Sequence, residues 1–185
     1  ELARNDVAEA LQGNRNPFID SPELVCEVWP CADTPVIAPA LWINEIHYDN
    51  EGADVGEGVE LAGFTSLQGY SLLLYNGSNG TIYGQIALDG ELDGTLWVAY
   101  SGLQNGDRDG IALVRGDELV EFVSWEGELD ASEGAAVGTR STELGVQQTS
   151  TTPVEQSLSR VGAGFMAADF TWVLAERSPG EVNVG

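Results

Sequence analysis

The stretch Leu41–Leu61, LWINEIHYDNEGADVGEGVEL, decides the fold of this chain. Apolar and polar residues alternate up to Tyr48 and again from Val59 to Leu61, and this period of two predicts two β-strands joined by an acidic, glycine-containing loop. In the second strand, we expect Glu60 on the face opposite Val59 and Leu61. In the first strand, we expect one face to carry Trp42, Asn44, Ile46 and Tyr48, and the other to carry Ile43, Glu45 and His47.

Short β-like segments continue to the end of the chain, separated by Gly, Asn and Asp. They are Tyr70–Tyr75, Thr81–Leu88, Leu96–Tyr100, Ile111–Val114, Leu119–Trp125, Ser157–Val161 and Phe170–Leu174. Tyr70–Tyr75 is almost wholly apolar, which predicts a strand buried on both faces. Gly116-Asp117 is typical of a hairpin turn. This spacing predicts an all-β, immunoglobulin-like β-sandwich over residues 41–185.

The first forty residues have a different character. Residues 1–31 predict a short helical appendage, with one helix ending near Gly13 and a second starting at Ser21-Pro22, a cap followed by proline at the first helical position. Residues 32–40 contain Pro35 and Pro39 and predict an extended linker.

The charge of the chain is strongly negative. It has 30 acidic residues against seven basic ones, all of them Arg, and a net charge of -23. Phosphate contacts need a positive surface, so we exclude direct nucleic-acid binding by this fragment. The acids indicate either a hydrated, solubilising surface or capture of cations. The sequence contains no run of 18 apolar residues, so it predicts no membrane span. No signal peptide is visible, although the sequence starts abruptly at Glu1.

Cys26 and Cys31 are the only cysteines. Metal sites usually combine more Cys or His at ligand spacing, and a redox motif would have two intervening residues rather than four. We therefore predict a structural disulfide, which indicates an exported protein and stabilises it by about 2 kcal/mol.

The loop after the first strand contains candidate metal ligands. Asp49, Asp54 and Glu57 are close enough in sequence to converge on a calcium ion, and Gly52 and Gly56 allow backbone carbonyls to turn inward. The alternative is a solvated acidic loop. A second candidate cluster consists of Asp107 and Asp109, with Arg108 between them as a neutralising charge.

Other motifs have structural interpretations that we prefer. His47, the only histidine, is expected to be a surface or half-buried strand residue rather than a catalytic base. Arg115-Gly116-Asp117 spells a receptor-binding tripeptide, but Gly-Asp at a hairpin tip is ordinary turn chemistry. Asn76 and Asn79 match glycosylation acceptors and are interpreted as turn residues. Core positions, rather than a sugar-binding platform, are predicted for Trp97, Trp125 and Trp172.

The motifs over residues 41–183, in this order, resemble a lamin-tail domain of secreted bacterial proteins. The resemblance rests on Ile43-Asn44-Glu45-Ile46, Asp49-Asn50, Glu57-Gly58-Val59-Glu60-Leu61, Asp109-Gly110-Ile111-Ala112-Leu113 and Ser178-Pro179-Gly180-Glu181-Val182-Asn183. Gly58 departs from the pattern, which usually has an aromatic residue there. The resemblance implies an immunoglobulin-like sandwich that serves attachment and has no catalytic centre.

The first 25 or so residues are similar to the C-terminal end of the endonuclease I family of extracellular nucleases. The matching block is Gln12-Gly13-Asn14-Arg15-Asn16-Pro17-Phe18-Ile19. In that family the metal-bound histidine and its partners lie upstream of this tail. The resemblance therefore implies a parent nuclease dependent on Mg²⁺ or Ca²⁺, and a fragment without its catalytic residues.

Three functions stay open from the sequence. The first is a secreted, non-catalytic module that tethers or stabilises a nuclease at a surface or in an assembly. The second is the trailing part of a metal-dependent endonuclease, helping to shape its substrate groove. The third is a surface or filament-forming protein whose edge strands pair between copies.

Overall fold

The computed structural model describes residues 9–10, 16–17, 41–164 and 166–183. The chain divides into two units, Glu1–Ala38 and Pro39–Gly185. Within the first unit, Glu9, Ala10 and Pro17 have helical conformation. The rest of the predicted helical appendage, the linker and both cysteines lie outside the described residues, so those expectations stay predictions.

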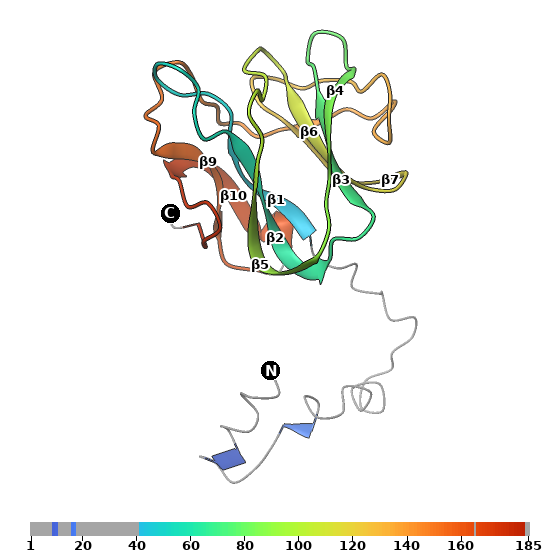
Figure 1. Ribbon diagram of the computed structural model, residues 1–185, viewed down its shortest axis with the longest axis vertical. Coiled ribbons are helices and arrows are strands. Elements are labelled where there is room, and N and C mark those ends of the chain that lie inside the picture. Colours follow the sequence, from blue (N-terminus) through green and yellow to red (C-terminus); the bar gives the residue numbers. More distant parts are fainter. Residues whose placement is uncertain (1–8, 11–15, 18–40, 165, 184–185) are drawn as a thin grey trace. The chain divides into compact units, whose positions relative to one another are not determined.

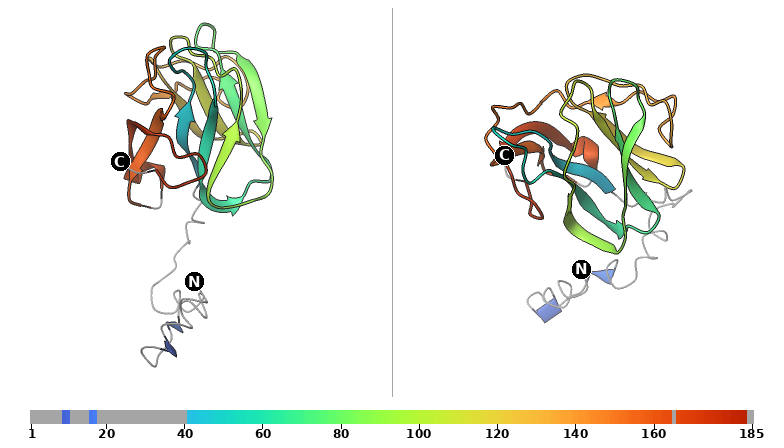
Figure 2. Two further views of the ribbon diagram at one scale, coloured as in Figure 1. Left: turned by 60° about the vertical axis from the view of Figure 1, so that its left-hand side comes forward. Right: turned by 45° about the horizontal axis from the view of Figure 1, so that its top comes forward.

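The second unit is a β-sandwich, as predicted, with two five-stranded sheets packed as layers (Figures 1 and 2). One sheet, here called sheet A, has the order β10-β9-β1-β2-β5, and the other, sheet B, has the order β4-β3-β6-β7-β8. All neighbours are antiparallel except β7 and β8. The strands are β1 (Leu41–His47), β2 (Gly58–Ser66), β3 (Tyr70–Tyr75), β4 (Ile82–Ala87), β5 (Glu91–Ala99), β6 (Gly110–Arg115), β7 (Glu118–Ser124), β8 (Thr142–Glu143), β9 (Gln156–Gly162) and β10 (Phe170–Glu176).

The predicted strands are all present, with differences in length. β2 continues to Ser66 and β5 begins at Glu91, so these two strands pair over nine residues. The two-residue strand β8 and the short 3-10 helix η2 (Ala167–Asp169) were not expected from the sequence. Such short elements have too few residues to show a hydrophobic period.

The main core lies between the sheets and includes Trp125, whose ring stacks on Tyr48 at 4.5 Å between centroids. β3 is buried on both faces, as predicted. Leu72 and Leu74 belong to this core, whereas Leu73 and Tyr75 belong to a second apolar cluster on the other face of sheet B. The residues that cover this second face come from the segment between β7 and β8 and are Leu129, Ala131 and Ala136.

One prediction about β1 is wrong, because the strand contains a β-bulge. Ile43 pairs with Leu61 and Glu45 pairs with Glu60, which leaves Asn44 as an extra residue without a partner on β2. An extra residue in a strand turns all later side chains of that strand to the opposite face of the sheet. The core side of β1 therefore carries Leu41, Ile43, Ile46 and, just after the strand, Tyr48. Trp42 lies on the opposite face from Ile46 and Tyr48, whereas the alternation predicted all three on one face.

Candidate functional site

The bulge in β1 brings polar groups together on the outward face of sheet A, the face turned away from sheet B. The Asn44 side chain accepts a hydrogen bond from Trp42 Nε1 at 3.2 Å and donates one to Glu60 Oε1 at 2.8 Å. Its backbone carbonyl accepts from Asn183 Nδ2 at 3.0 Å, and Asn183 Nδ2 also donates to the carbonyl of Arg160 at 3.0 Å. The bulged residue thus connects β1 and β2 to the C-terminal segment.

The C-terminal segment Ser178–Asn183 is held by two carboxylates that face each other across β1 and β2. Glu45 and Glu60 are both fully buried. Ser178 donates to Glu45 from its hydroxyl at 3.0 Å, and Gly180 donates its backbone N–H to Glu60 at 2.6 Å. Burial raises the pKa of Glu60 to about 7, although the hydrogen bonds from Asn44 and Gly180 act in the opposite direction. The SPGEVN motif therefore has a structural role, supplying donors to buried acids.

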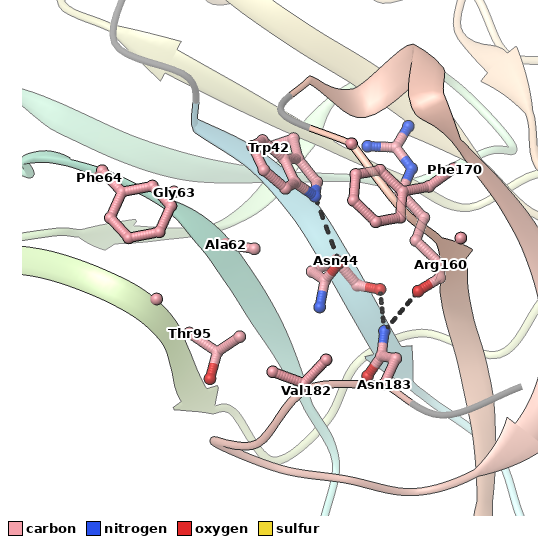
Figure 3. A pocket seen from close by; sticks show the side chains of 13 residues that line it. Trp42, Asn44, Ala62, Gly63, Phe64, Thr95, Arg160, Phe170, Val182 and Asn183 are labelled. Carbon is pink, nitrogen blue, oxygen red and sulfur yellow. Dashed lines mark hydrogen bonds between the residues drawn. The ribbon is translucent and has the colours of Figure 1, made fainter. Parts of the chain in front are cut away.

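A hollow of about 170 Å³ opens beside this network on the same sheet (Figure 3). Trp42 and Phe170 stack at 5.6 Å between centroids and lie next to each other in the lining. Phe64 and Val182 complete the rim and are the two most exposed large apolar side chains among the described residues, at 66% and 76%. Glycines, an alanine, a threonine and asparagines form most of the remaining lining. Most of the surface that the lining exposes in the hollow is nevertheless apolar.

Arg160 also lines the hollow, and its side chain joins the two sheets. Its guanidinium donates to Glu121 Oε1 of β7 at 2.6 Å and to the carbonyl of Ile43 at 3.0 Å. Glu121 in turn accepts the backbone N–H of Ile43 at 2.8 Å, and the guanidinium lies 4.8 Å from the ring centre of Trp172. Because every charge here has a partner, the hollow is backed by a neutralised ion pair rather than by a free cation.

Among the described residues that line the hollow, none carries a carboxylate, imidazole or thiol, the groups that most often serve in covalent or acid–base catalysis. Thr95 contributes a hydroxyl, and no described lining residue is a base that could activate it. The arrangement is suited to contact with an apolar group.

The predicted calcium ligands do not all come together. Burial, and then the negative charge of the neighbouring Asp54, raise the pKa of Asp49. The Glu57 carboxylate instead accepts the N–H of Gly102, in the loop after β5, at 2.7 Å. Within the described ranges, no three acidic, histidine or cysteine side chains form a group that could hold a metal ion. The calcium site remains a prediction with two of its three side chains adjacent.

The second acidic cluster is also divided between two roles. Asp109 is buried and accepts the backbone N–H groups of Gly77 at 2.8 Å and Gly106 at 2.9 Å. Burial raises its pKa despite these two hydrogen bonds. Asp107 is exposed. Arg108 between them adopts a positive φ of 69°. Asp109 therefore joins two loops, which sequence spacing alone did not indicate.

His47 is more deeply buried than expected, with no exposed surface. Its Nδ1 lies 2.9 Å from the carbonyl of Gln156, and its Nε2 lies 3.1 Å from the carbonyl of Val55. Gln148 Nε2 is also 2.8 Å from Nδ1. Burial, followed by the positive charge of Arg177, lowers the pKa of His47. The ring thus connects β1 to β9 and to the acidic loop between β1 and β2.

The remaining sequence motifs have the following environments. Trp125 is in the core as predicted, and Trp172 packs partly against it. The prediction is wrong for Trp97, which pairs with Glu60 on the outward face of sheet A. Its indole lies over Gly58, where a Cβ would come within 2.6 Å of the ring. The Trp97 ring of β5 therefore occupies the space beside Gly58, the position at which the lamin-tail pattern usually has an aromatic residue.

The two predicted turn asparagines behave as such. Asn76 Oδ1 accepts the N–H of Ser78 at 2.9 Å, and Asn79 Oδ1 accepts the N–H of Thr81 at 2.9 Å, the pattern of Asx-turns. Gly116 at the tip of the β6–β7 hairpin has a φ of 58°, which favours glycine. Turn geometry thus accounts for these residues.

Comparison with protein-family models, with curated proteins and with solved structures found no match. The lamin-tail and endonuclease I resemblances consequently rest on the sequence motifs alone. Among the described residues, no helix is long and apolar enough to cross a membrane.

Proposed function

We propose that residues 41–183 form a non-catalytic interaction module, and that the hollow on sheet A is where its partner docks. The observation that supports this most strongly is the exposure of Phe64 and Val182 at the rim of an apolar hollow. Exposed apolar side chains gathered at one concave place indicate a contact surface, whereas single scattered ones do not.

The chemistry of the surroundings indicates what kind of partner fits. About 170 Å³ accommodates one apolar or aromatic side chain. Two exposed acids flank the rim, since Asp93 pairs with Phe64 across β2 and β5 and Glu181 precedes Val182. With a net charge of -23, the chain repels anionic partners at long range. The partner is therefore a protein segment that presents an apolar side chain between cationic residues.

This proposal can be tested by titrating the chain with the acetylated, amidated tripeptide Arg-Phe-Arg and following backbone NMR shifts. Shifts should concentrate on the residues that line the hollow, which come from β1, β2, β5, β9, β10 and the C-terminal segment, and should weaken with added salt. The tripeptides Arg-Ala-Arg and Glu-Phe-Glu should bind less well, because each lacks one of the two features. Equal binding of all three, or shifts elsewhere on the domain, would refute the assignment.

A matched pair of variants tests the same surface from the protein side. Val182→Ser removes an apolar rim residue and should weaken binding of Arg-Phe-Arg. Val137→Ser removes an apolar side chain that is also exposed, at 59%, but that belongs to the segment covering sheet B. It should leave the affinity unchanged. If both variants bind like the wild type, the hollow is not the docking site.

The resemblance of residues 1–25 to the endonuclease I tail supports placing this module at the C-terminal end of an exported, metal-dependent nuclease. The module then tethers or stabilises that enzyme rather than taking part in its chemistry. Purified chain incubated with plasmid DNA and Mg²⁺ or Ca²⁺ should leave the DNA intact. Metal-dependent cleavage lost in His47→Ala would instead favour a direct part in the nuclease reaction.

A further inference from the structure

The sequence contains three Asn-Gly pairs, and all three lie in described loops: Asn76-Gly77, Asn79-Gly80 and Asn105-Gly106. This dipeptide is chemically labile, since glycine has no side chain to hinder attack by its own backbone nitrogen on the preceding side chain. The glycine N–H loses its proton, the nitrogen bonds to the asparagine Cγ, and ammonia leaves. Water then opens the resulting succinimide to aspartate or isoaspartate.

In two of the pairs, the attacking nitrogen is held by the same carboxylate. Asp109 Oδ1 accepts the N–H of Gly77 at 2.8 Å, and Asp109 Oδ2 accepts the N–H of Gly106 at 2.9 Å. Asp109 is only 3% exposed, so water does not compete well for these bonds. Hydrogen bonds to an ionised acceptor are stronger than those between neutral groups.

We propose that Asp109 protects Asn76 and Asn105 from deamidation. Removing the proton from either glycine nitrogen would place a second negative charge against the buried carboxylate, which opposes the first step of the reaction. The two hydrogen bonds also fix the glycine peptide groups relative to the asparagine side chains. One acidic residue thereby protects two loops, the one between β3 and β4 and the one between β5 and β6.

The third pair provides an internal comparison. Gly80 donates its N–H to the neutral carbonyl of Asn76 at 2.8 Å, and its own carbonyl accepts from Ser132 at 2.8 Å. Gly80 is buried against the segment that covers sheet B, and Asp109 does not contact its N–H. Protection of Asn79 is therefore independent of Asp109.

The test measures deamidation at each asparagine by peptide-mapping mass spectrometry after incubation in mildly alkaline buffer. The wild-type chain is compared in its native state and in urea, and with two variants. Asp109→Ala removes the carboxylate without creating a further Asn-Gly pair, since Gly110 follows it in the sequence. Asp107→Ala is the matched control, because it removes one exposed charge from the same loop.

Native wild type should deamidate more slowly than the urea-unfolded chain at all three sites. Asp109→Ala should accelerate the reaction at Asn76 and Asn105 roughly tenfold to a hundredfold, the factor that a charge-assisted hydrogen bond contributes. The rate at Asn79 should change little, and Asp107→Ala should behave like the wild type.

The proposal is overturned if Asp109→Ala leaves the rates at Asn76 and Asn105 unchanged, or accelerates all three sites equally through unfolding. Native-state hydrogen exchange of wild type provides a measurement that does not depend on the variant folding. The amides of Gly77 and Gly106 should exchange slowly, and exchange as fast as in the unfolded chain would also overturn it.

Discussion

Replacing Glu60 with glutamine should remove a large part of the pH dependence of the domain's stability. Burial raises the pKa of this carboxyl from 4.5 to about 7 in the folded state. The unfolded chain therefore releases this proton at lower pH than the folded domain does. Its contribution to stability is fully present below pH 4.5 and is lost as the pH rises to about 7. At about 1.4 kcal/mol for each pKa unit, the loss amounts to about 3 kcal/mol.

The substitution also has a cost that does not depend on pH. Glu60 accepts from Asn44 Nδ2 with one oxygen and from the Gly180 N–H with the other, at 2.8 and 2.6 Å. Glutamine has a single acceptor oxygen, so one of these two donors loses its partner, at a cost of about 1–3 kcal/mol. The two effects can be separated in a plot of the free energy of unfolding against pH. The lost hydrogen bond shifts the whole curve, whereas only the titration of residue 60 changes its slope.

The measurement is urea denaturation of wild type and Glu60→Gln at several values between pH 4 and about 8, the range over which folded and unfolded carboxyl groups titrate here. Other acids with raised pKa values, such as Asp49, Asp109 and Glu126, titrate in both proteins and cancel in the difference. Glu176→Gln, an exposed acid on β10, serves as the control and should parallel the wild type. Parallel curves for wild type and Glu60→Gln would refute the reasoning.

Further substitutions test the packing and the loops. Gly58→Ala should destabilise the domain by about 1–3 kcal/mol in urea denaturation, because its Cβ would lie 2.6 Å from the ring of Trp97; unchanged stability would contradict the close approach. Arg160→Met should cost about 3–5 kcal/mol by leaving the Glu121 carboxylate buried without its cation, and Arg160→Met/Glu121→Leu should recover most of that loss; a double variant no more stable than the single one would count against this ion-pair account. If the loop between β1 and β2 binds calcium, saturating calcium at about a hundred times its dissociation constant should stabilise the domain by about 2.7 kcal/mol, and Asp54→Asn should abolish the effect. A melting temperature that calcium leaves unmoved at constant ionic strength would exclude the site.

Much of the sandwich can be predicted from local sequence. The burial of β3 on both faces can be predicted without tertiary information. Its six residues are nearly all apolar, and such a strand is stable only between two layers. The β6–β7 hairpin is similarly evident from Gly116-Asp117 between two apolar runs. Both predictions depend on neighbours along the chain, and for these the period and the turn residues are enough.

The hollow is different, because its position depends on one residue of register. Asn44 fits the alternation of β1 as well as any polar residue does. Nothing local therefore indicates that it forms a bulge, which places Trp42 on the face opposite Ile46 and Tyr48. The bulge is decided by which residues of β2 can pair while Ile43 and Ile46 both stay buried.

The sequence by itself therefore determined the sandwich, its doubly buried strand, its turns and its acidic surface. The tertiary structure alone decided that Trp42, Phe64, Phe170 and Val182 meet at one hollow, and that one carboxylate, Asp109, holds two distant loops. The physical reason is that strand periodicity is a property of adjacent residues. Sites are built from side chains far apart in sequence, whose meeting depends on register, bulges and sheet order.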